Sequence, residues 1–472
     1  MNNIYYTISK KIPVYVLVFS LLYLLIIILS YNIPMFWDMS YISKIGNLIY
    51  DNHFSSIIFT GVDNGTPPLY SIYLAILWTV FGKSLFISHI AILPFSIGII
   101  YYFYKTSIRF IDKSYIPLSL LFLLIEPTIL TQTVLAGYDI VLCFFFLLGL
   151  NGVLENKRKK IALSLLFIPL LTLRGFTILF SVFLIDLYIN RKNYKSIKGI
   201  GKNIIVYIPA LLIFITWLFY HYYRAGWFYI SGNHSQIFIK TLSFESIIRN
   251  LIYIFWKIID FGKIGLFVFV PWLLIKYRKV KSFNIFFFSL FASVITYIIF
   301  FIPFSIPVSH RYFMITYIIG ILIFVYFISL IKQRYIRVIL SSIVVCLMLS
   351  GNLWTYPERY GNGWDSSLKV LPYFSLKKQF DNYLVSSNIN PMMVGTKFPV
   401  DLDNYDCNLT VEHFAFIDMD KKPFKEIPFV VQSNISNTFT PEEIETLNFK
   451  WKLVKEMRAW PVYIKLFKNP NK

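Results

Sequence analysis

The chain alternates between long apolar runs and short polar gaps, a pattern typical of a protein that crosses a membrane many times. Most of these runs approach the ~20 residues that a helix needs to cross ~30 Å of hydrocarbon. The fifth and sixth are shorter, so we expect the turn at Arg174 and Gly175 to lie inside the protein. Eleven spans are predicted, at residues 12–31, 85–104, 115–136, 138–154, 161–173, 176–190, 203–222, 258–275, 283–303, 312–331 and 337–354.

Residues 67–82 form a further apolar run, but the distribution of positive charge argues against counting it as a span. Lys and Arg gather in alternate gaps, and such clusters face the cytoplasm in membrane proteins. A span at 67–82 would invert every later gap, so we place this run as an interfacial helix within the first outer loop, residues 32–84. The predicted cytoplasmic clusters are Lys10/Lys11, Lys105/Arg109/Lys113, Lys157/Arg158/Lys159/Lys160, Arg191/Lys192/Lys195/Lys198/Lys202, Lys276/Arg278/Lys279/Lys281 and Lys332/Arg334/Arg337.

The same pattern predicts two parts on different sides of the membrane. A cytoplasmic N-terminus followed by eleven spans puts residues 355–472 outside the cell. That segment carries 15 basic and 14 acidic residues and includes strand-like runs such as PFVVQ and VYIKLF. We therefore expect a transmembrane domain of residues 1–354 and a small extracytoplasmic α+β domain of residues 355–472.

Composition narrows the classes of function. The chain is 57% hydrophobic and 15% charged, whereas soluble domains carry about 25% charged residues. A net charge of +21 would suggest nucleic acid in a soluble protein, but the membrane topology accounts for much of it, so we expect no nucleic-acid partner. Three scattered cysteines predict neither a disulfide framework nor a thiolate metal site.

Acidic residues at the predicted outer ends of the spans are candidates for catalysis. Asp38 follows the first span, and Asp139 separates the third span from the fourth. Each could simply cap a helix, but an ionisable group beside hydrocarbon is costly and often functional. A carboxylate here could act as a general base on an acceptor hydroxyl or amine. Asp63 is a third candidate, and Glu126 is expected to form a structural ion pair with Arg174.

Basic residues on the same side are candidates for binding an anion. His310, Arg311 and Tyr312 open the tenth span from outside, where Arg and Tyr also serve as interfacial anchors. An Arg side chain presents a planar set of donors suited to phosphate oxygens. Because an unpaired cation within the bilayer is costly, Arg174 must meet either a carboxylate or a substrate anion.

Five short motifs occur in a compatible order along the chain. They are Asp38-Met39-Ser40-Tyr41, Thr66-Pro67-Pro68-Leu69-Tyr70, Gly137-Tyr138-Asp139, Leu171-Thr172-Leu173-Arg174-Gly175 and Arg311-Tyr312. In these motifs the chain resembles the GT-C glycosyltransferases, especially bacterial relatives of protein O-mannosyltransferases and lipid A aminoarabinose transferases. The resemblance covers residues 12–190 well and 300–320 weakly. Met39 stands where the family usually has Glu, Thr66 where it has His or Lys, and Gly137 where it has Arg.

The resemblance implies an α-helical polytopic membrane protein that transfers a sugar from a polyprenyl-phosphate donor. The transfer would occur on the outer side of a bacterial cytoplasmic membrane, with inversion, and with Asp38 as the general base and Asp139 as the second catalytic acid. Arg311, Arg174 and His310 would bind the donor phosphate. The acceptor is left open among glycan, lipid and protein, and a divalent metal ion is also left open. The substrate cavity would be lined by Tyr41, Asp63, Thr66, Pro67, Pro68, Tyr70, Tyr138 and Tyr312.

Two other functions stay open at this point. A transporter of lipid-linked glycans would need charged groups along a path to the cytoplasmic face, whereas the intramembrane charges here gather at the outer end. A polysaccharide polymerase or ligase typically has a large late outer loop with Arg and His. Residues 223–257, with Arg224, His234 and Arg249, are a modest candidate for such a loop.

Overall fold

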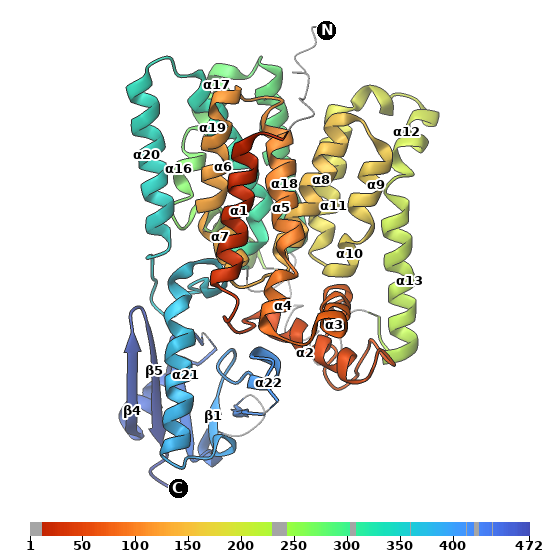
Figure 1. Cartoon of the computed structure of the whole chain (residues 1–472). Helices are drawn as coiled ribbons and strands as arrows, with labels where there is room; N and C mark the ends of the chain where they lie inside the picture. Colours follow the sequence, from red (N-terminus) through yellow and green to blue (C-terminus); the bar gives the residue numbers. More distant parts are fainter. Residues whose placement is uncertain are drawn as a thin grey trace.

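The protein consists of a bundle of helices with a small sheet domain at one end (Figure 1). Lys10, Lys11 and His234, which the sequence interpretation uses, lie outside the described residues. The computed structural model describes residues 12–228, 243–302, 308–358, 360–411, 413–419, 424–436 and 438–472.

The bundle is formed by apolar helices that pack around α19 (Met314–Leu330), in which every residue from Met314 to Ile328 is buried. The helices of the first half are α1 (Val14–Leu29), α2 (Asp38–Asp51), α3 (Leu69–Phe81), α4 (Leu85–Ile90), α5 (Leu93–Ser107), α6 (Ile116–Ile125), α7 (Pro127–Val134), α8 (Asp139–Glu155), α9 (Arg158–Leu166), α10 (Ile168–Leu171), α11 (Gly175–Ile189), α12 (Ile197–Ile204) and α13 (Ile208–Ala225). The second half adds α15 (Phe244–Ile259), α16 (Ile264–Phe267), α17 (Val270–Tyr277), α18 (Lys281–Phe301) and α20 (Arg334–Gly351).

The structure contains fewer long straight helices than the eleven spans predicted from the sequence, within the residues that it describes. Within the described residues, four helices are long and apolar enough to cross a membrane, or up to seven if each of three bent pairs counts as one span. One bend, of 60°, separates α6 from α7 at Glu126 and Pro127, because proline cannot continue the hydrogen bonding of the preceding turn. The count of eleven therefore stays a prediction.

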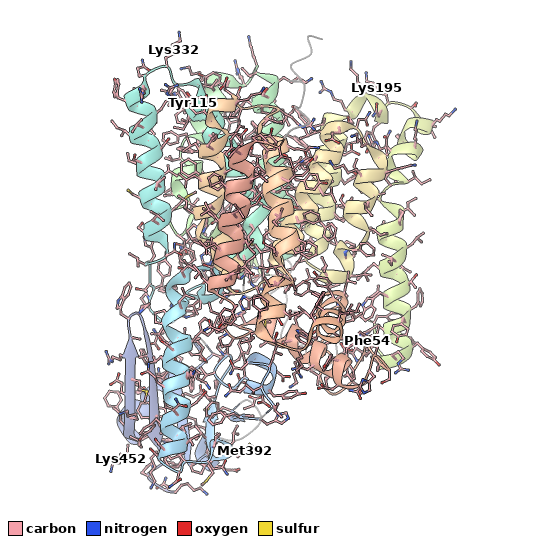
Figure 2. The ribbon with its side chains drawn as sticks, in the orientation of Figure 1. Phe54, Tyr115, Lys195, Lys332, Met392 and Lys452 are labelled. Carbon is pink, nitrogen blue, oxygen red and sulfur yellow. The ribbon has the colours of Figure 1, made fainter. Side chains whose placement is uncertain are left out.

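The apolar run at 67–82 forms α3, a helix of 13 residues that begins directly after Pro68. Together with α2 it lies at the end of the bundle that faces the sheet domain (Figure 1). Lys195 and Lys332, from two predicted cytoplasmic clusters, both lie at the opposite end (Figure 2). The helix and these two lysines thus lie at opposite ends of the bundle, and the side of the membrane that each end faces stays a prediction.

Residues 258–275, predicted as one span, do not form a single straight helix. The chain there forms α16 and α17, and the axis of α15 makes an angle of 92° with them. The bend between α15 and α16 contains Gly262 with a φ of 75°, and a Cβ at this position would lie 1.9 Å from the Leu347 carbonyl oxygen. Close packing against α20 and a left-handed backbone thus require glycine at the bend.

The expected ion pair between Glu126 and Arg174 is wrong. Glu126 instead pairs with Lys263, whose Nζ lies 3.4 Å from its Oε1, and both side chains are fully buried. The other carboxylate oxygen accepts a hydrogen bond from the Ile129 backbone N–H and caps α7. Arg174 finds its carboxylate partners elsewhere, as described below.

Replacing Lys263 with Met is expected to lower the free energy of unfolding by about 3–5 kcal/mol, because it leaves a buried carboxylate without its cation. The double variant Lys263→Met/Glu126→Gln should recover much of this loss, since no charge then stays unpaired. Thermal unfolding of the purified protein in detergent measures both effects. An unchanged midpoint in the single variant would contradict the pairing.

The C-terminal part contains a five-stranded mixed sheet in the order β2-β1-β3-β5-β4. Strand β3 pairs antiparallel with β5, placing Val431 opposite Leu466, and α21 packs its apolar face against β4 and β5. This agrees with the expected α+β character. The elements are α21 (Leu371–Ser386), α22 (Asn404–Cys407), α23 (Pro441–Lys450), β1 (Val394–Thr396), β2 (Ile417–Asp418), β3 (Phe429–Ser433), β4 (Lys452–Ala459) and β5 (Val462–Lys468).

Candidate active site

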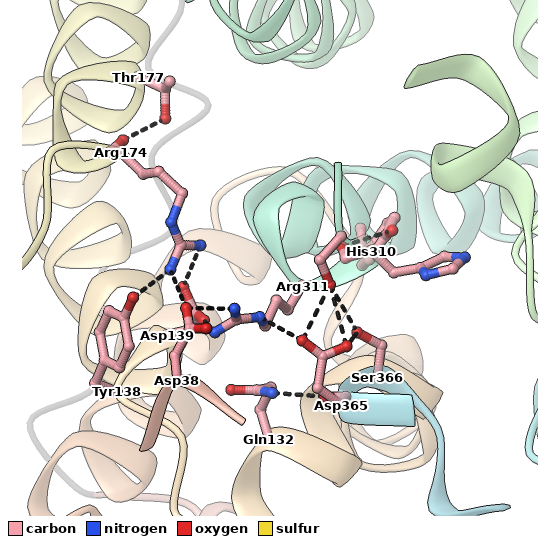
Figure 3. Close-up of polar contacts among 12 residues, drawn as sticks. Asp38, Gln132, Tyr138, Asp139, Arg174, Thr177, His310, Arg311, Asp365 and Ser366 are labelled. Atoms are coloured by element: carbon pink, nitrogen blue, oxygen red, sulfur yellow. Dashed lines mark hydrogen bonds and ion pairs between the residues drawn. The ribbon is translucent and has the colours of Figure 1, made fainter. Parts of the chain in front are cut away.

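Five charged residues from distant parts of the sequence meet in one cluster (Figure 3). Asp38 and Asp139 are the first residues of α2 and α8, where a carboxylate is favoured by the helix dipole. Arg174 precedes α11, Arg311 lies in the short 3₁₀ helix His310–Phe313, and Asp365 lies in another, Trp364–Ser366.

Arg311 is the centre of this cluster. Its Nη2 lies 2.5 Å from an Asp38 oxygen and its Nη1 lies 3.1 Å from an Asp139 oxygen. Its Nε lies 2.6 Å from an Asp365 oxygen. One guanidinium group therefore holds three carboxylates in fixed positions, which the planar fork of arginine permits and a lysine ammonium does not.

Arg174 contacts the same acids from the other side. Its Nη1 donates to Asp139 at 3.0 Å, and its Nη2 lies 3.8 Å from Asp38. Nη2 also donates to the Tyr138 hydroxyl, and the guanidinium carbon lies 4.0 Å from the centre of the Tyr312 ring. Two aspartates and two arginines thus form a closed network.

The five residues of the cluster differ in exposure, and their three carboxylates outnumber their two guanidinium groups. The side chains of Asp139, Arg311 and Asp365 are 3–4% exposed, whereas Arg174 is 17% and Asp38 is 39% exposed. Burial opposes ionisation of Asp38, but Arg311 and Arg174 outweigh it and hold the pKa of Asp38 below its usual value. Asp38 is therefore an ionised carboxylate that solvent or a substrate can reach.

Asp365 was not expected from the sequence. It belongs to the segment assigned to the outer domain, yet it packs into the bundle, where the Ser309 and Ser366 hydroxyls donate to its carboxylate at 2.9–3.2 Å. The Gln132 side chain donates to its backbone oxygen at 2.6 Å. The sequence around Asp365 is a polar stretch after the last apolar run, and it carries no signal that this segment packs back against the helices.

The same glutamine accounts for one departure from the GT-C pattern. A Cβ at Gly137 would lie 1.8 Å from the Gln132 side-chain oxygen. An arginine, as found in the family, would therefore displace Gln132 and its bond to the Asp365 segment. In this chain, Arg174 and Arg311 supply the cations next to Asp139.

His310 does not join the phosphate candidates. Its ring is fully buried and points away from the cluster (Figure 3), with Nε2 2.6 Å from an Asp260 oxygen. It also stacks on Phe261, with the ring centres 4.3 Å apart. His310 is therefore paired with Asp260, away from the charged cluster. The two cations of the cluster are Arg174 and Arg311.

The residues predicted from the first outer loop divide into two groups. The Tyr70 ring lies 6.2 Å from that of Tyr138, next to the cluster, and α3 begins after Pro67 and Pro68. The remaining residues hold the loop together and attach it to α13. Asp63 pairs with His221 at 2.6 Å, the Tyr41 hydroxyl accepts from the Asn64 backbone N–H, and the Thr66 N–H donates to the Asn64 side chain.

A cavity of about 20 Å³ lies beside the cluster, lined on its polar side by Asp139, Arg174, Arg311 and Tyr312. It has room for a water-sized group. Within the described residues, no three His, Cys, Asp or Glu side chains gather in a way that could hold a metal ion.

Comparison with known proteins supports the fold. No protein-family model and no curated protein sequence matches the chain. The crystal structure of ArnT from Cupriavidus metallidurans bound to undecaprenyl phosphate aligns with a TM-score of 0.55 at 13% identity, covering 97% of this chain and 98% of that chain. The apo state of ArnT gives 0.54 at 13% identity, with 96% and 97% covered. This chain therefore has the fold of the ArnT structures, which confirms at the level of fold the GT-C resemblance seen in its sequence.

Proposed function

We propose that this protein is an inverting glycosyltransferase that moves a sugar from a polyprenyl-phosphate donor to an acceptor on the extracytoplasmic side of the membrane. The main support for this proposal is that Asp38 and Asp139 converge on two arginines. The shared fold adds support, because one ArnT structure holds undecaprenyl phosphate. A carboxylate next to guanidinium groups provides a base and a phosphate site in one place.

Asp38 is the general base of this proposal because it is the accessible carboxylate of the cluster. It takes the proton of the acceptor nucleophile while that atom bonds to the anomeric carbon of the sugar. The bond from the anomeric carbon to the phosphate oxygen breaks on the opposite face. The electron pair stays on the lipid phosphate, and a single displacement inverts the anomeric centre.

The two arginines have different tasks. All three nitrogen positions of Arg311 already face carboxylates, so its first task is to hold Asp38 and Asp139 in place. Arg174 is more exposed and pairs with two carboxylates rather than three, so it is the better donor to an arriving phosphate. A phosphate that draws Arg174 away from Asp38 would raise the pKa of that carboxylate and so strengthen the base.

The activity test uses the purified protein in lipid nanodiscs with radiolabelled donors. Hexoses and pentoses linked to undecaprenyl phosphate are compared with oligosaccharides linked to undecaprenyl diphosphate. Cleavage of monosaccharide-phosphate donors alone is expected. Use of diphosphate-linked oligosaccharides alone would identify a polymerase or ligase, and movement of lipid-linked glycan without cleavage would identify a transporter.

Replacing Arg174 with Ala should raise the KM for the donor about tenfold or more, because a charge-assisted bond to phosphate contributes ~1.5–3 kcal/mol. Arg337→Ala is the matched control, since Arg337 also donates to a tyrosine hydroxyl, that of Tyr115, at the far end of the bundle (Figure 2). An unchanged donor KM in Arg174→Ala, measured by initial rates, would remove Arg174 from the phosphate site.

A further inference from the structure

A second and much larger cavity lies between the start of the first outer loop and the C-terminal domain. Its volume is about 730 Å³, and its walls come from residues 32–36, α21 and the segment from Pro399 to Thr410. Pockets that bind drug-sized ligands fall in the range of roughly 300–1,000 Å³. The cavity beside the charged cluster is far smaller, so the large cavity is the better place for an extended substrate.

The lining of this cavity combines aromatic rings with amides and charged groups. Phe36, Tyr373 and Phe374 contribute rings, and Asn32 and Asn382 contribute amides. Amides supply both a donor and an acceptor, which matches the hydroxyl groups of a sugar, while aromatic rings offer apolar faces to the C–H side of a sugar ring. An acyl chain would instead leave these polar groups without partners.

The charges of the lining indicate one further property of the ligand. Lys377 is neutralised by Asp381, with both oxygens at 2.7 Å from its Nζ. Lys378, the next residue of α21, is exposed at the cavity and has no ion pair or hydrogen bond to another described residue. An unpaired cation at the rim favours a ligand that carries a negative group.

The cavity wall is continuous with the segment that carries the proposed base. Phe36 precedes Asp38 by two residues, a separation of at most about 7 Å between Cα atoms. This segment is held by the C-terminal domain: the Met35 N–H donates to the Cys407 oxygen at 2.8 Å, and the Phe36 and Phe374 ring centres are 5.3 Å apart. A ligand in the cavity would therefore contact the chain that leads directly to Asp38.

From these observations we infer that the large cavity binds an anionic saccharide, namely the glycan portion of the acceptor. The identification of this saccharide as part of the acceptor rests on the proposed function. Saccharide binding itself can be measured without any transfer. An acyl chain as the occupant is then disfavoured, because it offers no partner to the amides or to Lys378.

The test fills the cavity with a bulky side chain. Ser375 lies on α21 at the cavity and is exposed. Ser386 is likewise an exposed serine of the same helix, but it does not line the cavity. Each hydroxyl donates to the carbonyl three residues earlier. Ser375→Trp is the cavity variant, and Ser386→Trp is its matched control.

Binding is measured on the full-length protein in nanodiscs by saturation-transfer NMR, with maltotriose, chitotriose and trigalacturonate as probes. We expect trigalacturonate to bind the wild type and Ser386→Trp, to lose at least tenfold in affinity for Ser375→Trp, and to weaken with Lys378→Ala but not with the sheet control Lys452→Ala. Failure of all three probes to bind, or equal trigalacturonate binding by Ser375→Trp and the wild type, would overturn the inference. Sugar transfer, assayed in parallel, should persist in the control Ser386→Trp, which leaves the cavity lining unchanged. Absence of transfer from a wild type that still binds trigalacturonate would count against the proposed function alone.

Discussion

Asp38→Asn should lower sugar transfer by about 10²–10⁴-fold, the usual contribution of a general base, while the protein still folds. The fold should persist because the cluster contains three carboxylates and two guanidinium groups, and removal of one negative charge leaves it balanced. Asp51→Asn is the matched control, since Asp51 ends the same helix that Asp38 begins. Transfer rates and thermal unfolding of both variants decide the matter, and wild-type turnover in Asp38→Asn would exclude the role of base.

The pKa of Asp38 also predicts the pH dependence of the wild type. Because this pKa is lowered, the carboxylate is ionised at every pH above the ordinary aspartate range near 4. The value of kcat/KM should therefore stay level as the pH falls from 7 to about 5, and any loss due to Asp38 should appear only below that range. A decline centred near pH 6 would indicate that another group acts as the base.

Arg311→Ala is expected to abolish transfer and to lower the free energy of unfolding by about 3–5 kcal/mol. Arg311 and two of its three carboxylate partners are almost fully buried, and a buried charge that loses its partner is strongly destabilising. With Arg311 removed, Asp365 would lose its cation, and Arg174 would be the remaining partner of Asp38 and Asp139 within the cluster. Thermal unfolding and donor cleavage of the purified variant measure the two losses.

A double variant separates this electrostatic effect from simple loss of packing. Adding Asp365→Asn to Arg311→Ala removes one of the repelling carboxylates, so part of the stability should return. Activity should not return, because Asp38 and Asp139 would still lack the guanidinium that aligns them. Stability that stays equally low in the double variant would show that Arg311 acts by packing rather than by charge.

The local pattern of the sequence was sufficient to place several long helices and to single out four residues of the charged cluster as candidates. Predicted apolar runs correspond to α1, α8, α11, α18, α19 and α20, because hydrophobicity and length are properties of neighbouring residues. Asp38 and Asp139 were identified because a carboxylate next to an apolar run is costly anywhere along the chain. Arg174 followed from the same argument, and Arg311 from the fit of its planar donors to phosphate oxygens.

Which residues come together was decided only by the tertiary structure. The sequence predicted an ion pair between Glu126 and Arg174. In the structure Glu126 pairs with Lys263, and Arg174 pairs with Asp139. Asp365 joins the cluster although it follows Arg311 by 54 positions, and no periodicity links the two. An ion pair across such a separation depends on how helices and loops pack in space, so local composition determines the candidates and the packing of distant segments selects the partners.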